Sequence, residues 1–214
     1  MTDRDRAYIL VGMLARSPDI TRRSILEAAF EEIRIYGFQA ASLSHILDKV
    51  DVTKGALYHH FSDKKALGYA VLDEIIKEMV INKWVVPLAS GNPIDAMLHT
   101  LQQEGCKLSE EKIFIGCPLN NLAQELSALD EGFRQRIQDI YALWSHGISD
   151  ALKRGQTEHS VQPEIDTDAA ATFIIAAIEG CLGMTKSSNN IHLLYQCGTG
   201  LAHYLETLRH KPNK

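Results

Sequence analysis

Residues 42–61 read SLSHILDKVDVTKGALYHHF, and this stretch predicts two short helices joined by a tight break. Ser42 and Thr53 precede the two helical segments, and their hydroxyl oxygens suit them to cap the first backbone N–H groups of a helix. The apolar residues are spaced to share one small core; they are Leu43, Ile46, Leu47, Val50, Val52, Leu57 and Phe61. This spacing is typical of a helix-turn-helix whose second helix faces outward.

The second helix of this pair carries residues that suit the major groove of DNA. Its outward positions combine hydroxyl groups, a positive charge, imidazoles and a glycine that permits close backbone approach. They are Thr53, Lys54, Gly55, Tyr58, His59 and His60. Around this helix we expect Arg22, Ser42 and Lys64 to contact phosphates, Ser42 because free N–H groups at a helix start attract anions. The alternative is that the basic residues form only a solvated face.

The flanking sequence also follows the helical period. One segment runs from a cap at Thr21 to a stop at Gly37, and a longer one, capped by Ser62, runs from Asp63 to about Val86. Further helices are predicted to start at Pro93, Pro118, Asp130, Asp166 and Asn190. The expected fold is therefore all-α. It has an N-terminal leader or arm at 1–18, a three-helix DNA-binding domain with a helix-turn-helix at 19–65, and a helical effector-sensing and dimerisation domain at 66–214.

The charge distribution is compatible with DNA binding despite the net charge of -5. Residues 1–65 hold ten Lys and Arg against nine Asp and Glu, and the rest of the chain holds twelve against eighteen. Because attraction to phosphates is screened within about 10 Å at ordinary salt, one basic face is sufficient. The acidic surplus belongs to the larger C-terminal part.

The segment from Phe38 to Leu67 resembles the signature of the TetR family of transcriptional regulators. The resemblance covers roughly residues 21–68 and rests on Phe38-Gln-Ala-Ala-Ser-Leu and on the run from Thr53 to Leu67, which combines cap, turn, exposed aromatic and Phe-x-x-Lys-x-x-Leu in fixed register. It implies that Thr53, Lys54, Tyr58, His59 and Lys64 lie at or near DNA. It also implies a homodimer that binds a near-palindromic operator as a repressor and is released by an effector.

TetR-like proteins pair through their last two long helices, and residues 167–188 and 190–209 occupy those places here. Small residues in these segments permit close helix approach, and apolar ones supply buried area. We expect the dimer interface to contain Phe173, Ala177, Ile178, Leu194, Leu201 and Leu205. The alternative use of the same residues is an intramolecular core.

The middle helices of this family surround the effector. Candidate wall residues of such a pocket are Trp84, Met97, Leu101, Phe114, Leu122, Tyr141 and Trp144, with Asn121, His146 or Glu179 as polar anchors. Ordinary core packing is the alternative for each.

Cys117 is a second kind of sensor candidate, because Ile115-Gly-Cys-Pro-Leu resembles a branch of the family in which some regulators respond to electrophiles or oxidants. It precedes a predicted helix start, where the dipole lowers a thiol pKa. A buried packing role is the competing interpretation. Cys106, Cys181 and Cys197 are predicted to be packing residues.

Other classes of protein find little support in the sequence. It lacks the H-E-x-x-H motif, zinc-type Cys/His pairs, a nucleophile elbow and a phosphate loop, so we expect no metal, no cofactor and no catalysis. The apolar run from Ile9 to Leu14 is too short to span a membrane. We expect a cytoplasmic protein. The alternatives are a helical dimeric interaction protein that lacks DNA binding and a thiol enzyme built on Cys117.

Overall fold

The computed structural model describes residues 18–107 and 115–210. Within these ranges the regular structure is helical, apart from one antiparallel bridge between Val161 and Arg209. The predicted all-α class is therefore confirmed. The chain divides into two compact units, and the boundary falls between Ile75 and Ile76. The leader or arm expected at 1–18 lies, except for Pro18, outside the described residues.

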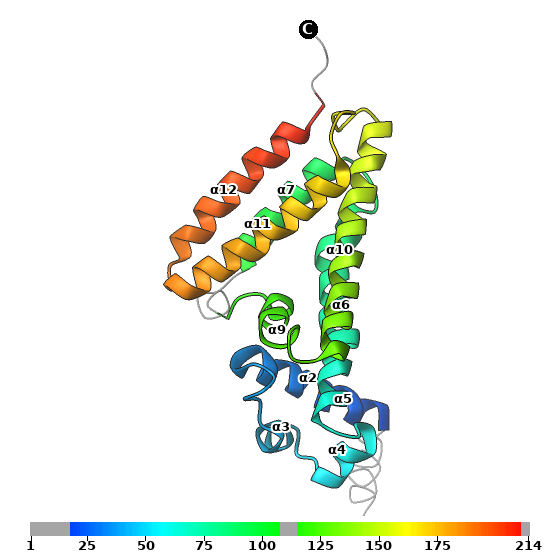
Figure 1. Ribbon diagram of the computed structural model, residues 1–214, viewed down its shortest axis with the longest axis vertical. Coiled ribbons are helices and arrows are strands. Elements are labelled where there is room, and N and C mark those ends of the chain that lie inside the picture. The colour runs from blue at the N-terminus through cyan, green and yellow to red at the C-terminus, as the bar shows by residue number, and fades with distance from the viewer. Residues whose placement is uncertain (1–17, 108–114, 211–214) are drawn as a thin grey trace, which may run out of the picture. The chain divides into compact units, whose positions relative to one another are not determined.

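The helices of the first unit are α2 (Pro18–Tyr36), α3 (Leu43–Val50), α4 (Lys54–His60) and α5 (Lys64–Ala70) (Figure 1). α3, α4 and α5 each pack against α2. α2 begins at Pro18 rather than after Thr21, and it ends before Gly37, whose φ of 81° suits glycine at a helix C-terminus.

Both predicted caps of the helix pair are confirmed. Ser42 Oγ accepts a hydrogen bond from the His45 N–H, and Thr53 Oγ1 accepts one from the Ala56 N–H at 3.2 Å. Of the predicted small core, Ile46, Leu57 and Phe61 are buried and the other members are half-buried. The helix pair is thus fixed by a few apolar anchors.

The predicted long helix after α4 is present but contains wider turns. Asp63, not Ser62, caps α5 by accepting the Ala66 N–H at 2.7 Å. The chain then continues through the π-helical turn η1 (Val71–Ile76), α6 (Lys77–Val80), a second π-helical turn η2 (Ile81–Val85) and the 3₁₀ turn η3 (Val86–Leu88). Such turns redirect the side chains that follow and often mark functional sites. Trp84 belongs to η2.

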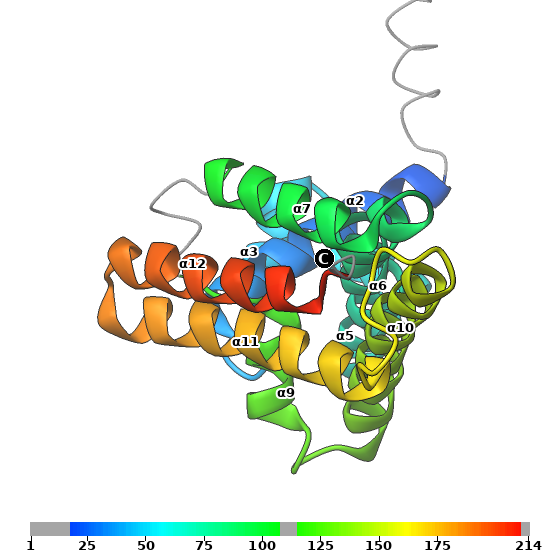
Figure 2. The same ribbon diagram turned by 90° about the horizontal axis from the view of Figure 1, so that it is seen from above.

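The second unit adds α7 (Pro93–Lys107), α9 (Pro118–Leu126), α10 (Glu131–Thr157), α11 (Thr167–Ser188) and α12 (Ile191–Leu208). Asp130, Asp166 and Asn190 cap α10, α11 and α12 through side-chain oxygens, as predicted. α12 lies between α7 and α11 and packs against both (Figure 2), while α10 packs against α11 and α9. The core between these helices includes Trp144, which is 1% exposed.

Among the described helices, α11 is long and apolar enough to cross a membrane, by length and composition only. Core helices of soluble proteins can be equally long and apolar. α11 packs between α10 and α12, and its inward face buries Ala171, Ile174 and Ile178. Packing inside the second unit thus accounts for part of its apolar character.

Candidate DNA-binding surface and effector site

The outward face of α4 is the candidate DNA-binding surface. Buried Leu57 and Phe61 hold the helix from beneath, while the outward side chains are exposed or half-exposed; these are Thr53, Lys54, Gly55, Tyr58, His59 and His60. The Lys54 ammonium lies 5.9 Å from the centre of the Tyr58 ring, which is 42% exposed. α4 contains no acidic residue. It therefore presents hydroxyl, ammonium and imidazole donors without a competing carboxylate of its own.

A buried carboxylate, which sequence reasoning missed, holds α3 against α2. Glu32 of α2 is 1% exposed and accepts hydrogen bonds from the Lys49 ammonium at 2.9 Å, from the Ser42 N–H at 3.3 Å and from His45 Nδ1 at 3.2 Å. Burial alone would raise the pKa of Glu32, but these hydrogen bonds together lower it. No local pattern marks the contact, because its donors lie ten or more residues away.

Two predicted phosphate contacts have partners inside the first unit. The Arg22 guanidinium donates to both carboxylate oxygens of Glu74, at 2.6 and 2.5 Å, and lies 5.1 Å from the centre of the Phe61 ring. This pairing lowers the pKa of Glu74. The Lys64 ammonium donates to the Gln39 carbonyl oxygen at 3.0 Å and lies over the Phe38 ring. Both basic residues thus stabilise contacts within the first unit, and their contact with DNA stays a prediction.

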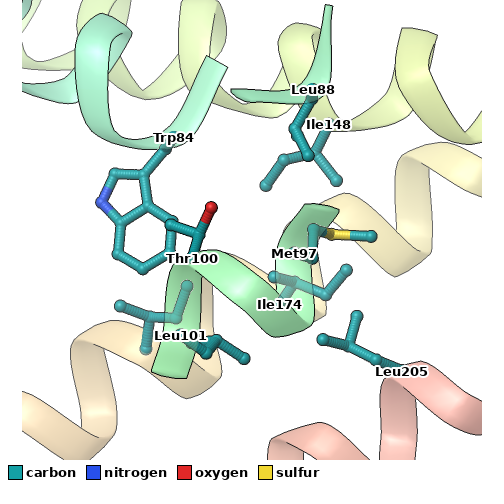
Figure 3. A pocket seen from close by; sticks show the side chains of 9 residues that line it. Trp84, Leu88, Met97, Thr100, Leu101, Ile148, Ile174 and Leu205 are labelled. Atoms are coloured by element: carbon teal, nitrogen blue, oxygen red, sulfur yellow. The ribbon is translucent and has the colours of Figure 1, made fainter. Parts of the chain in front are cut away.

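A small apolar cavity lies between the helices of the second unit (Figure 3). Its free volume is about 10 Å³, which is room for roughly one water molecule. Its walls come from η2, η3, α7, α10, α11 and α12; they are Trp84, Leu88, Met97, Thr100, Leu101, Ile148, Ile174, Ile178 and Leu205. Trp84, Met97 and Leu101 were predicted wall residues. The Thr100 hydroxyl donates to the Ala96 carbonyl oxygen, so it is already used within α7.

An aromatic stack leads away from this cavity. The Trp84 ring stacks on Trp144, with centroids 5.4 Å apart, and the Trp144 ring stacks on Tyr141, with centroids 6.4 Å apart. None of Leu122, Tyr141 and Trp144 lines the cavity, although all three were predicted to do so, and Phe114 lies outside the described residues. Trp144 packs behind Trp84 because α10 lies against η2.

Cys117, a half-buried residue, is the N-cap of α9, and its side chain makes no capping bond. Burial, with the neighbouring Glu179 of α11, raises the pKa of the Cys117 thiol well above its usual range. This direction is opposite to the lowering that a helix start alone would give, and it agrees with the interpretation of Cys117 as a packing residue. The thiol is enclosed beside an acidic group, and that environment outweighs the local backbone.

The polar anchors proposed from the sequence separate in the structure. Asn121 donates to the Ile115 carbonyl oxygen at 2.8 Å and accepts from the Lys186 ammonium at 3.0 Å, so it holds the turn before α9 instead of lining the cavity. His146 is exposed. Glu179 is 7% exposed; its carboxylate lies beside the Cys117 thiol, a weak donor that lowers its pKa, and has no N–H or O–H partner among the described residues.

The predicted interface residues of α11 and α12 fall into two groups. Ile178, Leu201 and Leu205 are buried within the second unit, and two of them line the cavity, so the intramolecular alternative applies to them. Phe173 is 51% exposed, and Ala177 and Leu194 are half-buried. Sequence reasoning missed Met184 and Tyr195, which are also exposed.

Comparison with known proteins is consistent over both units. The family model described as "Bacterial regulatory proteins, tetR family" matches residues 25–71, and "Tetracyclin repressor-like, C-terminal domain" matches residues 98–194. An uncharacterized HTH-type transcriptional regulator of Lactococcus lactis is 31% identical over 180 residues, which are 81% of this chain and 87% of that protein. These matches point to DNA-binding regulators and not to an enzyme family.

Solved structures agree. A TetR transcriptional regulator from Chloroflexus aurantiacus superposes with a TM-score of 0.79 at 25% identity, over 91% of this chain and 98% of that one. The reduced form of Escherichia coli NemR, an HTH-type transcriptional repressor, superposes with a TM-score of 0.77 at 26% identity, over 91% of this chain and 100% of that one. The chain belongs to the TetR family of bacterial DNA-binding transcriptional regulators.

Proposed function

We propose that this regulator is a cytoplasmic repressor, which binds a near-palindromic operator as a homodimer through α4 and leaves the DNA when a small molecule occupies the interior of its second unit. The observation that carries the DNA-binding half is the outward face of α4, where Lys54, Tyr58 and His59 are exposed above the buried anchors Leu57 and Phe61. Donors on a rigid helix are what major-groove readout requires.

The α4 surface divides into two kinds of contact. The Thr53 hydroxyl oxygen accepts the Ala56 N–H, so its own proton is left to donate to a phosphate. Lys54 supplies charge, and exposed Gly55 adds no side chain between backbone and DNA. Tyr58 and His59 are long enough to reach base edges. We assign positioning to the first three residues and sequence readout to the last two.

The homodimer is supported by the outward face of α11 and α12. Phe173, Ala177, Gly180 and Met184 follow a helical period along α11, and three of them are exposed while Ala177 is half-buried. A Cβ atom at Gly180 would meet nothing within 4 Å in the single chain. Such a face permits close approach of a second copy of the chain, and the ring of Phe173 would add apolar area to the interface.

For effector sensing we favour the interior of the second unit over modification of Cys117. A thiol reacts as its thiolate, and the raised pKa of Cys117 keeps the thiol protonated at neutral pH. The cavity has apolar walls and contains flexible Met97, which can move aside for a ligand larger than water. An effector that fits only one arrangement of the helices would shift the population away from the DNA-binding state.

The DNA-binding proposal is tested by fluorescence anisotropy on a duplex from the DNA upstream of the regulator's own gene. We expect Lys54→Ala to lower the magnitude of the log Kd against log salt slope by about 1, as loss of one phosphate contact does. Tyr58→Ala should weaken specific binding by about tenfold or more, and Tyr58→Phe separates the hydroxyl from the ring. Lys77→Ala, an exposed lysine of α6, is the matched control.

Unchanged binding by the Lys54→Ala, Tyr58→Ala double variant would reject the proposed readout. Absence of any salt-sensitive specific binding by the wild type would favour the alternative of a helical interaction protein. Cys117→Ser addresses the sensing mechanism: we expect an electrophile such as N-ethylmaleimide to act equally on both proteins at neutral pH. DNA release by the electrophile that is lost in Cys117→Ser would restore the thiol switch.

A further inference from the structure

The side chain that the proposed function leaves unexplained is Glu179 of α11. It is 7% exposed, and among the described residues the one donor beside its enclosed carboxylate is the thiol of Cys117, which is a weak donor. Burial of a carboxylate with so weak a donor is unfavourable, and more so when the carboxylate is charged. α11 has exposed positions on which a glutamate would carry no such cost, so the placement of Glu179 calls for a ligand that satisfies it.

The surroundings of Glu179 supply no compensating cation. Its neighbours from the adjoining elements are the Cys117 thiol before α9 and Tyr141 of α10, and burial raises the pKa values of both, so both remain neutral. Lys83 of η2 acts on the carboxylate from a distance, but its ammonium is paired with Glu104 at 2.5 Å. Burial raises the pKa of Glu179 to about 7. A positive charge beside it would stabilise the ionised form.

Three stacked aromatic rings lie between this carboxylate and the apolar cavity, which Glu179 itself does not line. The stack runs from Trp84, which lines the cavity, through Trp144 to Tyr141, which lies near Glu179. Ile178, the residue before Glu179, is itself a wall residue of the cavity. The Trp144 indole N–H is also buried without a partner among the described residues. Cations bind to the faces of tryptophan and tyrosine rings as well as to carboxylates.

We propose that Glu179 determines the specificity of the effector site, which binds an organic amine: the protonated nitrogen pairs with the Glu179 carboxylate beside the aromatic stack, and the apolar part enters the cavity, which widens as Met97 moves aside. The inference rests on the proposed function, because the amine would be its effector. A neutral ligand of the same shape gains only the apolar burial and leaves the carboxylate unsatisfied. Discrimination between an amine and its alcohol analogue therefore comes from one side chain.

The chain carries its own reporter for this site. Its two tryptophans are Trp84 and Trp144, so intrinsic tryptophan fluorescence comes only from the aromatic stack. The probes are three matched pairs of increasing size: hexylamine and hexanol, cyclohexylmethylamine and cyclohexylmethanol, and 4-phenylbutylamine and 4-phenylbutanol. Each is titrated into the full-length wild type, into Glu179→Gln and into Glu164→Gln, an exposed glutamate that serves as the matched control.

We expect at least one amine to bind wild type and Glu164→Gln at least tenfold more tightly than its alcohol. In Glu179→Gln this preference should disappear, while the alcohol binds as before. Amine binding to the wild type should weaken at least tenfold between pH 8 and pH 5.5, because Glu179 is protonated at the lower pH and the amines stay charged. Alcohols that bind as tightly as amines, no amine binding, or an unchanged preference in Glu179→Gln would each overturn the inference.

Operator release by the same amine separates this inference from the proposed function. If the amine binds through Glu179 and the wild-type protein leaves its DNA, both stand. If the amine binds through Glu179 while DNA affinity is unchanged, the binding site stands and effector-controlled repression by this ligand class fails. If operator binding and release occur without any preference for amines, repression stands and the inference fails.

Discussion

Two buried glutamates have opposite environments. Glu32 is enclosed by Lys49, Ser42 and His45, which together stabilise its charge, whereas Glu179 is enclosed by neutral groups. Both residues are less than a tenth exposed, so burial alone does not decide what a carboxylate does. The hydrogen-bond donors around a buried carboxylate determine whether it stabilises the fold, as Glu32 does, or is available to a ligand, as we propose for Glu179.

Replacing Glu32 should loosen the helix-turn-helix. In Glu32→Ala, Lys49 and the Ser42 N–H lose a partner, and we expect a loss of about 1–3 kcal/mol in the free energy of unfolding, with weaker operator binding. The folded-state pKa of Glu32 is depressed, so this stabilisation is present above the unfolded pKa of about 4.5 and is lost as the pH falls. Urea unfolding followed by circular dichroism measures it. Glu31→Ala on the same helix is the control and should cost far less.

Replacing Glu179 by a neutral residue should raise the free energy of unfolding at high pH, whereas replacing Glu32 should lower it. The folded-state pKa of Glu179, about 7, lies above the unfolded value of 4.5, so the native state binds more protons between these values and stability declines as the pH rises through this window. Glu179→Gln should match the wild type near pH 5 and be more stable at pH 8, by up to roughly 3 kcal/mol. Thermal unfolding at both pH values tests this. Equal stability at pH 8 would mean that the carboxylate is compensated.

At the scale of elements, close contacts in the second unit depend on glycine. A Cβ atom at Gly147 of α10 would lie 2.9 Å from two methyl carbons of Val85, so this glycine lets η2 and its Trp84 approach α10. At Gly155 a Cβ atom would lie 2.5 Å from Val161 and 2.8 Å from Pro93. The end of α10 therefore packs directly under the loop that returns to α11.

Gly155→Ala should destabilise the protein. The added methyl group forces the Val161 and Pro93 side chains apart, and overpacking of this kind typically costs about 1–3 kcal/mol. The gain in helix propensity offsets about 1 kcal/mol of that cost. Differential scanning calorimetry should find a Tm lower by several degrees. Gly105→Ala in α7, where a Cβ atom meets nothing within 4 Å, should leave Tm equal or raise it slightly.

At the scale of the whole molecule, the central prediction is self-association through α11 and α12. Gly180→Glu places a charge on the proposed interface without a clash inside the single chain. We expect this variant to sediment as a folded monomer and to lose high-affinity operator binding, because two half-sites then lack a linked pair of α4 helices. Analytical ultracentrifugation measures the first effect and anisotropy the second. Gly105→Glu is the control, and a Gly180→Glu variant that remains dimeric would exclude this face.

The helical class, most helix limits and the outward residues of α4 could be predicted from the sequence. These features depend on neighbours three or four positions apart: Ser42 and Thr53 cap through backbone groups within one turn, and Leu57 and Phe61 face inward by helical period. Family membership followed from the same local register. Caps and inward-facing positions depend on residues within one or two helical turns, so the sequence is sufficient to predict them.

The partners of charged and reactive groups, in contrast, could be identified only in the folded structure. Arg22 pairs with Glu74, 52 residues away, and Asn121 holds Ile115 and Lys186 rather than an effector. A helix start alone would lower the pKa of Cys117, but enclosure beside Glu179 raises it. Ile178 and Leu205, which were predicted at the dimer interface, line the cavity inside the second unit. Desolvation and pairing depend on which helices pack together, and a short segment of sequence does not specify its distant packing partners.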